Sequence, residues 1–168
     1  MNNDNAASTT PVGENMSLLN GMAAHEMSVS AHSPQQQLEG QQTLQRILVV
    51  EDDPTLATLE AEVLAAHGYT VFTVNNGELA ITTLRRSIPD LVVLDLELTG
   101  TISGWDVFQV LRTFTNIPVL MTTSAATPVR KYIRSCGETR FTLDHLPKPY
   151  PMQIFLKRIK RMLSILPQ

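Results

Sequence analysis

Two short apolar runs that end in carboxylates constrain the fold of this chain more than any other feature. Residues 47–50 run into Glu51, Asp52 and Asp53, and residues 91–94 run into Asp95. Runs this short and continuously apolar are typical of strands buried on both faces of a parallel sheet. The carboxyl ends of such strands meet at one edge, where open α/β folds bind their ligands. An acid there either serves a site or only ends the strand, and Asp95 alone does not decide between the two.

Segments with helical periodicity alternate with short apolar segments along the chain. We expect strands over residues 47–50, 70–74, 91–94, 119–123 and 140–146. We expect helices from Pro54 to a cap at Gly68, over residues 78–87, from near Gly104, and over residues 128–135 and 152–164. The expected core positions in these helices are Leu56, Leu59, Val63, Leu79, Ile81, Leu84, Trp105, Phe108, Leu111, Met152, Phe155, Ile159, Met162 and Leu163. This alternation predicts a doubly wound α/β fold, a parallel sheet with helices on both faces.

Polar side chains stand at the ends of four of the expected strands. They are Glu51 and Asp52, Asp95, Thr123, and Lys148. Because parallel strands end at one edge, we expect these groups to converge. Neighbouring acids repel one another, and Mg²⁺, which binds carboxylates and bridges to phosphate oxygens, relieves that repulsion. A phosphoryl group in transfer spreads its charge over three oxygens, and Mg²⁺, the lysine ammonium and the threonine hydroxyl offer one partner to each.

Four motifs around these groups resemble the receiver domain of two-component response regulators, over about residues 46–166. The motifs are ILVVEDDP at residues 47–54, LVVLD at 91–95, PVLMTTSA at 118–125 and LPKP at 146–149. Each is common alone, whereas all four in this order and near the family's spacing are specific. The resemblance implies a flavodoxin-like sheet of five parallel strands in the order 2-1-3-4-5, with the domain at residues 45–168.

The resemblance also implies how the acids act. Asp95 would accept a phosphoryl group from the phosphohistidine of a sensor histidine kinase or phosphotransfer protein. Asp52 would hold Mg²⁺ directly, Glu51 would hold it through water, and Asp95 and the backbone carbonyl of Glu97 would be further ligands. The chemistry is then limited to self-phosphorylation and autodephosphorylation of Asp95, so we do not expect an enzyme that acts on other substrates.

The remaining polar groups would act as a switch. Lys148 would pair with the phosphoryl group, and Thr123 would turn toward it. His145 lies where the family usually has an aromatic residue whose rotation is coupled to that of the threonine. The resemblance thus implies that phosphorylation changes a protein-interaction face.

This chain departs from the family pattern without losing a catalytic group. Thr99 stands where a proline is usual, and the loop glycine comes one residue late, at Gly104. Ser124 fills a position that is usually small and apolar, and residues 137–146 are a few residues longer than usual. The departures nearest to the acceptor lie in the loop at residues 96–104.

Two other functions fit parts of the sequence. Residues 95–101, DLELTGT, resemble the nucleophile loop of haloacid-dehalogenase-type phosphatases, with Glu97 in place of their second aspartate. That loop normally follows the first strand and an acid pair comes late, whereas here the acid pair comes first. A pseudo-receiver, an interaction module that no longer uses phosphate, is compatible with the altered loop, but the intact acids, Thr123 and Lys148 argue against it.

The charges are unevenly distributed along the chain. Residues 1–44 contain no Lys or Arg and little apolar surface, and we expect a disordered arm there. Residues 45–111 contain three basic and ten acidic residues, whereas residues 112–168 contain ten basic and two acidic ones. The basic side chains near the C-terminus, Arg130, Lys131, Arg134, Lys157, Arg158, Lys160 and Arg161, form either a solvated face or a docking face, including one for a homodimer.

Location and output follow from what the sequence lacks. The chain has one cysteine, no secretory signal and no apolar run of membrane-spanning length, so we expect a cytoplasmic protein that does not enter a membrane. We expect a stand-alone receiver, with no recognition module after residue 168. We therefore expect the signal to leave through a downstream protein or by onward phosphotransfer, and not by direct nucleic-acid binding.

Overall fold

The structure, a computed structural model, describes residues 44–164 as a five-stranded sheet with five helices. In chain order these elements are β1 (Arg46–Val50), α1 (Pro54–Ala65), β2 (Thr70–Val74), α2 (Gly77–Arg86), β3 (Leu91–Asp95), α3 (Gly104–Arg112), β4 (Val119–Thr123), α4 (Ala126–Ser135), β5 (Leu143–Pro147) and α5 (Met152–Leu163). All strand pairs are parallel, in the order β2-β1-β3-β4-β5. The predicted fold class and strand order are confirmed. The arm predicted at residues 1–44 lies outside the described residues except for Leu44.

The three central strands are buried because they consist mainly of Val, Leu, Ile and Met. Every residue of β3 and β4 is buried, as are the four apolar residues of β1. The edge strand β2 instead exposes Phe72 and Thr73. Apolar side chains therefore point to both faces of the sheet, and each face needs a helical cover.

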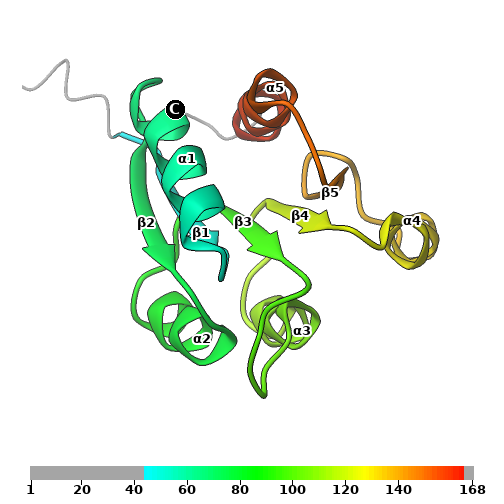
Figure 1. Cartoon of the computed structure of the whole chain (residues 1–168). Helices are drawn as coiled ribbons and strands as arrows, with labels where there is room; N and C mark the ends of the chain where they lie inside the picture. Colours follow the sequence, from blue (N-terminus) through cyan, green and yellow to red (C-terminus); the bar gives the residue numbers. More distant parts are fainter. Residues whose placement is uncertain (1–43, 165–168) are drawn as a thin grey trace, which may run out of the picture. The chain divides into compact units, whose positions relative to one another are not determined.

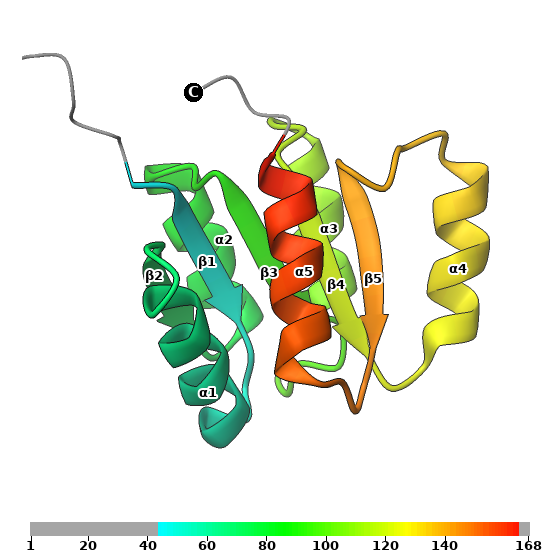
Figure 2. The ribbon, with the colours of Figure 1, turned by 90° about the horizontal axis from the view of Figure 1, so that it is seen from above.

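Helices cover both faces of the sheet (Figure 1). α1 and α5 lie on one face, where Leu64, Phe155 and Ile159 pack against alternate residues of the central strands. α2 and α3 cover the other face, where Phe108 is fully buried. α4 contributes Val129 to this second cluster and lies beside β5 (Figure 2). Both faces of the sheet are therefore covered by apolar packing, and the strand ends are where polar groups can gather.

Local hydrogen bonds fix where two helices begin. The Asp53 carboxylate accepts from the backbone N–H groups of Thr55 and Leu56, which makes it the N-cap of α1. Ser103 caps α3 in a reciprocal arrangement with Asp106. The Asp53 carboxylate thus serves the start of the helix.

The predicted buried faces of α1 and α2 are partly wrong. Leu59 is 44% exposed and Leu79 is 49% exposed. In α1 the face toward the sheet instead carries Ala57, Glu60 and Leu64. The physical reason is that a small side chain, here Ala57, lets the helix lie close to the sheet, and that Glu60 has a hydrogen-bond partner across the interface.

The predicted boundaries of β5 and α4 are also shifted. β5 begins at Leu143, three residues after the predicted start, because the preceding residues form a turn in which the Thr142 and Leu143 N–H groups donate to the Thr139 carbonyl at 3.0 and 2.9 Å. α4 begins at Ala126, so Pro128 lies in its first turn, where a missing N–H costs nothing. None of the helices between residues 44 and 164 is long and apolar enough to cross a membrane.

Candidate functional site

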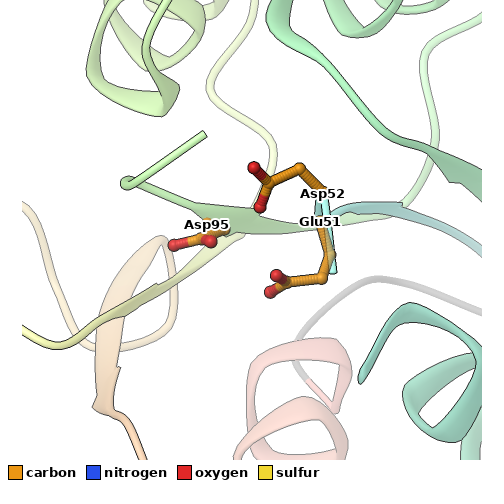
Figure 3. Close-up of side chains that lie close together, drawn as sticks. All are labelled: Glu51, Asp52 and Asp95. Carbon is orange, nitrogen blue, oxygen red and sulfur yellow. The ribbon is translucent and has the colours of Figure 1, made fainter. Parts of the chain in front are cut away.

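Three carboxylates from two adjacent strands meet at the carboxyl edge of the sheet. β1 and β3 are paired with Val50 opposite Leu94, so the residues that follow them emerge side by side. One carboxylate oxygen each from Glu51, Asp52 and Asp95 lies within 4.8 Å of the other two. Figure 3 shows the side chains of Glu51 and Asp52 extending from the end of β1 toward the side on which Asp95 lies. The convergence expected from the strand pattern is therefore present.

Lys148, which directly follows β5, joins two of these acids. Its Nζ donates to Glu51 Oε2 and to Asp95 Oδ2, each at 2.8 Å. Glu51 and Asp95 are each only 2% exposed. Burial raises the pKa of Glu51, and burial alone would lower the pKa of Lys148, but hydrogen bonds to Asp95 and Glu51 carry it above its ordinary value. One ammonium against three carboxylates leaves two negative charges, which is the charge that a divalent cation neutralises.

The loop after β3 reaches back to the acids through its backbone. The Glu97 N–H donates to Asp95 Oδ1 at 3.0 Å, so both carboxylate oxygens of Asp95 accept a hydrogen bond. The Thr99 N–H donates to Asp52 Oδ2 at 2.9 Å, and hydrogen bonding by Thr99 lowers the pKa of Asp52. A proline at position 99 has no N–H to offer, so the departure noted in the sequence supplies a contact to the acid cluster.

Gly104 is required by a close approach of α3 to Asp95. A Cβ on Gly104 would lie 1.9 Å from the Asp95 carbonyl oxygen and 2.7 Å from Leu96 Cα. The late glycine therefore marks the point where the loop returns to the end of β3. The loop is also tied to α2, since the Thr101 hydroxyl donates to Glu78 Oε1 at 2.5 Å.

Thr123 lies buried at the end of β4, and the Glu97 side chain lies beside it. The Thr123 hydroxyl donates to Glu97 Oε1 at 3.4 Å and accepts from the Ala125 N–H at 2.9 Å. Glu97 Oε2 accepts from the Ser124 N–H at 3.0 Å, which lowers the pKa of the Glu97 carboxyl. The sequence prediction gave Glu97 only a backbone role and missed this side-chain contact. The sequence feature that could have indicated this contact is an acidic residue in the loop after one strand, together with two hydroxyl residues at the end of the next strand.

His145 lies in β5 and faces α4. Its Nε2 accepts from Arg130 Nε at 3.0 Å, so the proton of the neutral ring is on Nδ1. Burial lowers the pKa of His145, and the neighbouring Arg130 contributes in the same direction. Among residues 44–164, no hydrogen bond joins His145 to Thr123.

The basic face predicted on α5 is partly neutralised. Arg158 Nη1 lies 2.5 Å from Asp144 Oδ2, and Arg161 pairs with the same oxygen. Asp144 is buried in β5 and needs these partners, because an unpaired buried carboxylate is costly. Lys157 and Lys160 remain exposed on the outer side. Two of the four basic residues of α5 are therefore paired with a buried acid of the same domain.

Comparison with known proteins places this geometry in a family. The family model for the response regulator receiver domain matches residues 47–160. The DNA-binding response regulator MtrA of Mycolicibacterium smegmatis is 36% identical over 119 residues, which cover 71% of this chain and 50% of that protein. The chain spans about half the length of the curated relatives it matches.

Solved receiver structures resemble this fold. The receiver domain of the sensor histidine kinase PA1611 of Pseudomonas aeruginosa, with magnesium coordinated in its active site cleft, matches with a TM-score of 0.62 and 25% identity, over 72% of this chain and 98% of that chain. The BeF3-activated N-terminal receiver domain of RstA of Klebsiella pneumoniae matches with a TM-score of 0.60 and 30% identity, over 70% of this chain and 97% of that chain. Neither the phosphatase nor the pseudo-receiver interpretation is favoured by these matches. The chain therefore belongs to the response regulator receiver family, the phosphorelay domains of two-component signalling.

Proposed function

We propose that Asp95 accepts a phosphoryl group from the phosphohistidine of a sensor histidine kinase or phosphotransfer protein. The observation that carries this proposal is the Lys148 ammonium, 2.8 Å from both Asp95 and Glu51 in a cluster of three acids. In the reaction, the bond between phosphorus and the donor nitrogen breaks as a bond forms between phosphorus and an Asp95 oxygen. Autodephosphorylation by water reverses the modification, and no other substrate is processed.

The three acids fit a magnesium ion. Their oxygens lie within 4.8 Å of one another, and hard oxygen ligands with an excess of negative charge are what Mg²⁺ prefers. Asp52 and Asp95 would bind the ion directly, Glu51 would bind it through water, and the Glu97 backbone carbonyl would be a further ligand. When bound, Mg²⁺ would neutralise charge on the phosphoryl oxygens. The magnesium in the PA1611 receiver domain, which has the same fold, supports this assignment.

The lysine and threonine would bind the transferred group. Lys148 donates to Asp95 in the unphosphorylated state, so its ammonium has only a short way to move to reach a phosphoryl oxygen. The Thr123 hydroxyl donates to Glu97 over 3.4 Å, a long contact that it would exchange for a stronger bond to the charged phosphoryl group. His145 would follow by breaking its hydrogen bond with Arg130, which alters the surface between β5 and α4.

The output of the switch is proposed to be a protein contact in the cytoplasm. The exposed Lys157 and Lys160, together with Lys131 of α4, are candidates for a partner or a second copy of the chain. MtrA is named as a DNA-binding regulator, and only half of it aligns with this chain. The expected lack of direct nucleic-acid or membrane binding stays a prediction, as does the boundary between the arm and the domain at residue 45.

The test is labelling of the whole chain with a radioactive small phosphodonor and Mg²⁺. Wild type should take up at most one phosphoryl group per chain, and Asp95→Asn should take up none. Asp90→Asn, at the opposite end of β3, keeps an acceptor for the Arg46 N–H and should label like wild type. A chelator should stop the labelling. Equal labelling of Asp95→Asn and wild type would remove Asp95 from the proposal, and steady release of phosphate from phosphomonoesters would favour a phosphatase.

A further inference from the structure

Glu60 is a charged residue at a position where a helix normally carries an apolar one. It lies in the middle of α1 on the face toward the sheet, and its side chain is 0% exposed. Burying a carboxyl without a hydrogen-bond partner costs several kcal/mol. The chain has Leu59 next to it and leaves that side chain exposed. Packing alone therefore does not explain why Glu60 faces inward.

The partner of Glu60 is Tyr150, which follows the end of β5. The Tyr150 hydroxyl donates to Glu60 Oε1 at 2.6 Å, a short bond between residues 90 positions apart. The tyrosine ring stacks on Phe155 of α5, with centroids 5.9 Å apart and planes inclined by 17°. α1 and α5 lie on the same face of the sheet (Figures 1 and 2). Tyr150 is therefore held by a helix on each side.

Tyr150 stands two residues after Lys148. On the other side of this short segment, the Lys148 N–H donates to the Thr123 carbonyl at 2.9 Å. The segment at residues 148–150 is thus fixed at its start by β4 and at its end by Glu60. From the first of these anchors, the Lys148 side chain reaches Glu51 and Asp95.

Two buried polar side chains lie near this segment, one in α1 and one in β4. Glu60 Oε2 is buried without a hydrogen-bond partner among the described residues. Burial and Glu60 raise the pKa of Tyr150, and the nearby Thr122 hydroxyl acts on it in the opposite direction. Thr122 is the residue of β4 paired with Asp95 in the sheet. The charges of Glu51, Asp95 and Lys148 all contribute to the pKa of Glu60, after its burial and its bond to Tyr150. Glu60 therefore interacts electrostatically with the charged groups of the site, although it lies in α1 and not at a strand end.

We propose that Glu60 and Tyr150 form a positioning pair for Lys148. Their hydrogen bond fixes the segment at residues 148–150, and this holds the ammonium between Glu51 and Asp95. Glu60 touches neither the phosphoryl group nor the donor, so it is a positioning residue and not a catalytic one. The inference rests on the proposed phosphorylation of Asp95.

The test uses variants that separate positioning from packing. Glu60→Met fills the space without an acceptor, Tyr150→Phe deletes one oxygen, and Glu60→Gln keeps an acceptor for the Tyr150 hydroxyl. Glu62→Met, on the exposed side of the same helix, is the matched control. Below the unfolding transition, Glu60→Met and Tyr150→Phe should each slow labelling of Asp95 about tenfold, less than the hundredfold that a misplacement of about 1 Å can cost. Glu60→Gln and Glu62→Met should stay within about twofold of wild type.

Two further measurements distinguish the pair from a purely structural contact. Replacement of a buried charge by an apolar side chain is often neutral or stabilising, so Glu60→Met should unfold at the same or higher urea concentration while labelling more slowly. The double variant Glu60→Met/Tyr150→Phe should be no slower than either single variant, because both break one bond. The ¹⁵N resonance of the Lys148 ammonium, measured without phosphodonor, should shift in both single variants and not in Glu62→Met.

The outcomes are separable from those of the proposed function. If wild type does not label, the proposed function fails, and the Lys148 resonance still decides whether the pair positions the ammonium. If wild type labels and Glu60→Met and Tyr150→Phe label at the same rate with an unmoved Lys148 resonance, the positioning pair is refuted. If Glu60→Met does not fold, Tyr150→Phe decides the question by the same two readouts.

Discussion

The buried Glu60 carboxyl should make the stability of this domain depend on pH in a range where ordinary carboxylates no longer titrate. Its burial raises its pKa from the ordinary value of 4.5 to about 7, against the lowering effect of the Tyr150 hydrogen bond. The charges of Glu51 and Asp95 contribute to this rise, and the charge of Lys148 opposes it. The test variant is Glu60→Gln. It keeps the shape of the side chain and an oxygen that accepts from the Tyr150 hydroxyl, and it removes the titratable carboxyl.

The sign follows from the direction of the pKa change. Because the folded state holds the proton of Glu60 more tightly than the unfolded state, its contribution to stability is fully present below about pH 4.5 and is lost as the pH rises through about 7. This interval, at about 1.4 kcal/mol per pH unit, corresponds to about 3 kcal/mol. The side chain is fully buried, so solvent screening does not reduce the figure.

The assay is urea unfolding of wild type and Glu60→Gln in a chelating buffer, at steps between about pH 4.5 and about pH 8. Other groups whose pKa is perturbed, such as Glu51 and His145, are present in both proteins and cancel to first order in the difference. The free energy of unfolding of wild type, minus that of the variant, should fall by about 3 kcal/mol as the pH rises. A difference that stays constant within about 0.5 kcal/mol would refute the argument that Glu60 is buried as a proton-binding group.

Three further predictions concern the strand-end site. Lys148→Met removes the one ammonium that bonds to Glu51 and Asp95 within residues 44–164, so labelling of Asp95 should fall at least about a hundredfold. A smaller loss would mean that another cation stabilises the transferred group. Thr99→Pro removes the N–H bonded to Asp52, so the pKa of that carboxyl should rise toward its ordinary value in a ¹³C NMR titration, and an unchanged pKa would contradict the contact. Gly104→Ala places a Cβ 1.9 Å from the Asp95 carbonyl oxygen, so urea unfolding should show a loss of at least about 3 kcal/mol, and a loss below about 1 kcal/mol would mean that the loop can yield.

The sequence was sufficient for the features that depend on local pattern. The central strands were predicted from continuous apolar runs, and a parallel sheet then brings Glu51, Asp52 and Asp95 to one edge whatever the rest of the chain does. Asp53 caps the helix that was predicted to begin at Pro54, because an N-cap depends on the residues immediately after it. Lys148 was also found, since it ends a strand of the same sheet.

The sequence was insufficient where a contact depends on how two elements face each other. A stripe through Leu59 and one through Glu60 are both possible on α1, and the choice depends on Tyr150, 90 residues further on. The side chain of Glu97 and the N–H of Thr99 bind partners on other strands, and their residue types alone do not indicate these contacts. The start of β5 was placed too early because Thr142 is β-branched and also favours the turn that it forms.

The hydrogen bonds of Lys148 also bear on when the domain becomes competent during folding. The ammonium joins Glu51 and Asp95 across 97 and 53 residues of chain, so the first, third and fifth strands must all be in place before it can reach both acids. Contacts of such separation form late, because the entropy of closing the intervening chain has to be overcome first. A partly folded chain that lacks β5 has the acids but not their counter-charge. In the proposed phosphorelay, only a chain that has completed its sheet would be able to receive a signal.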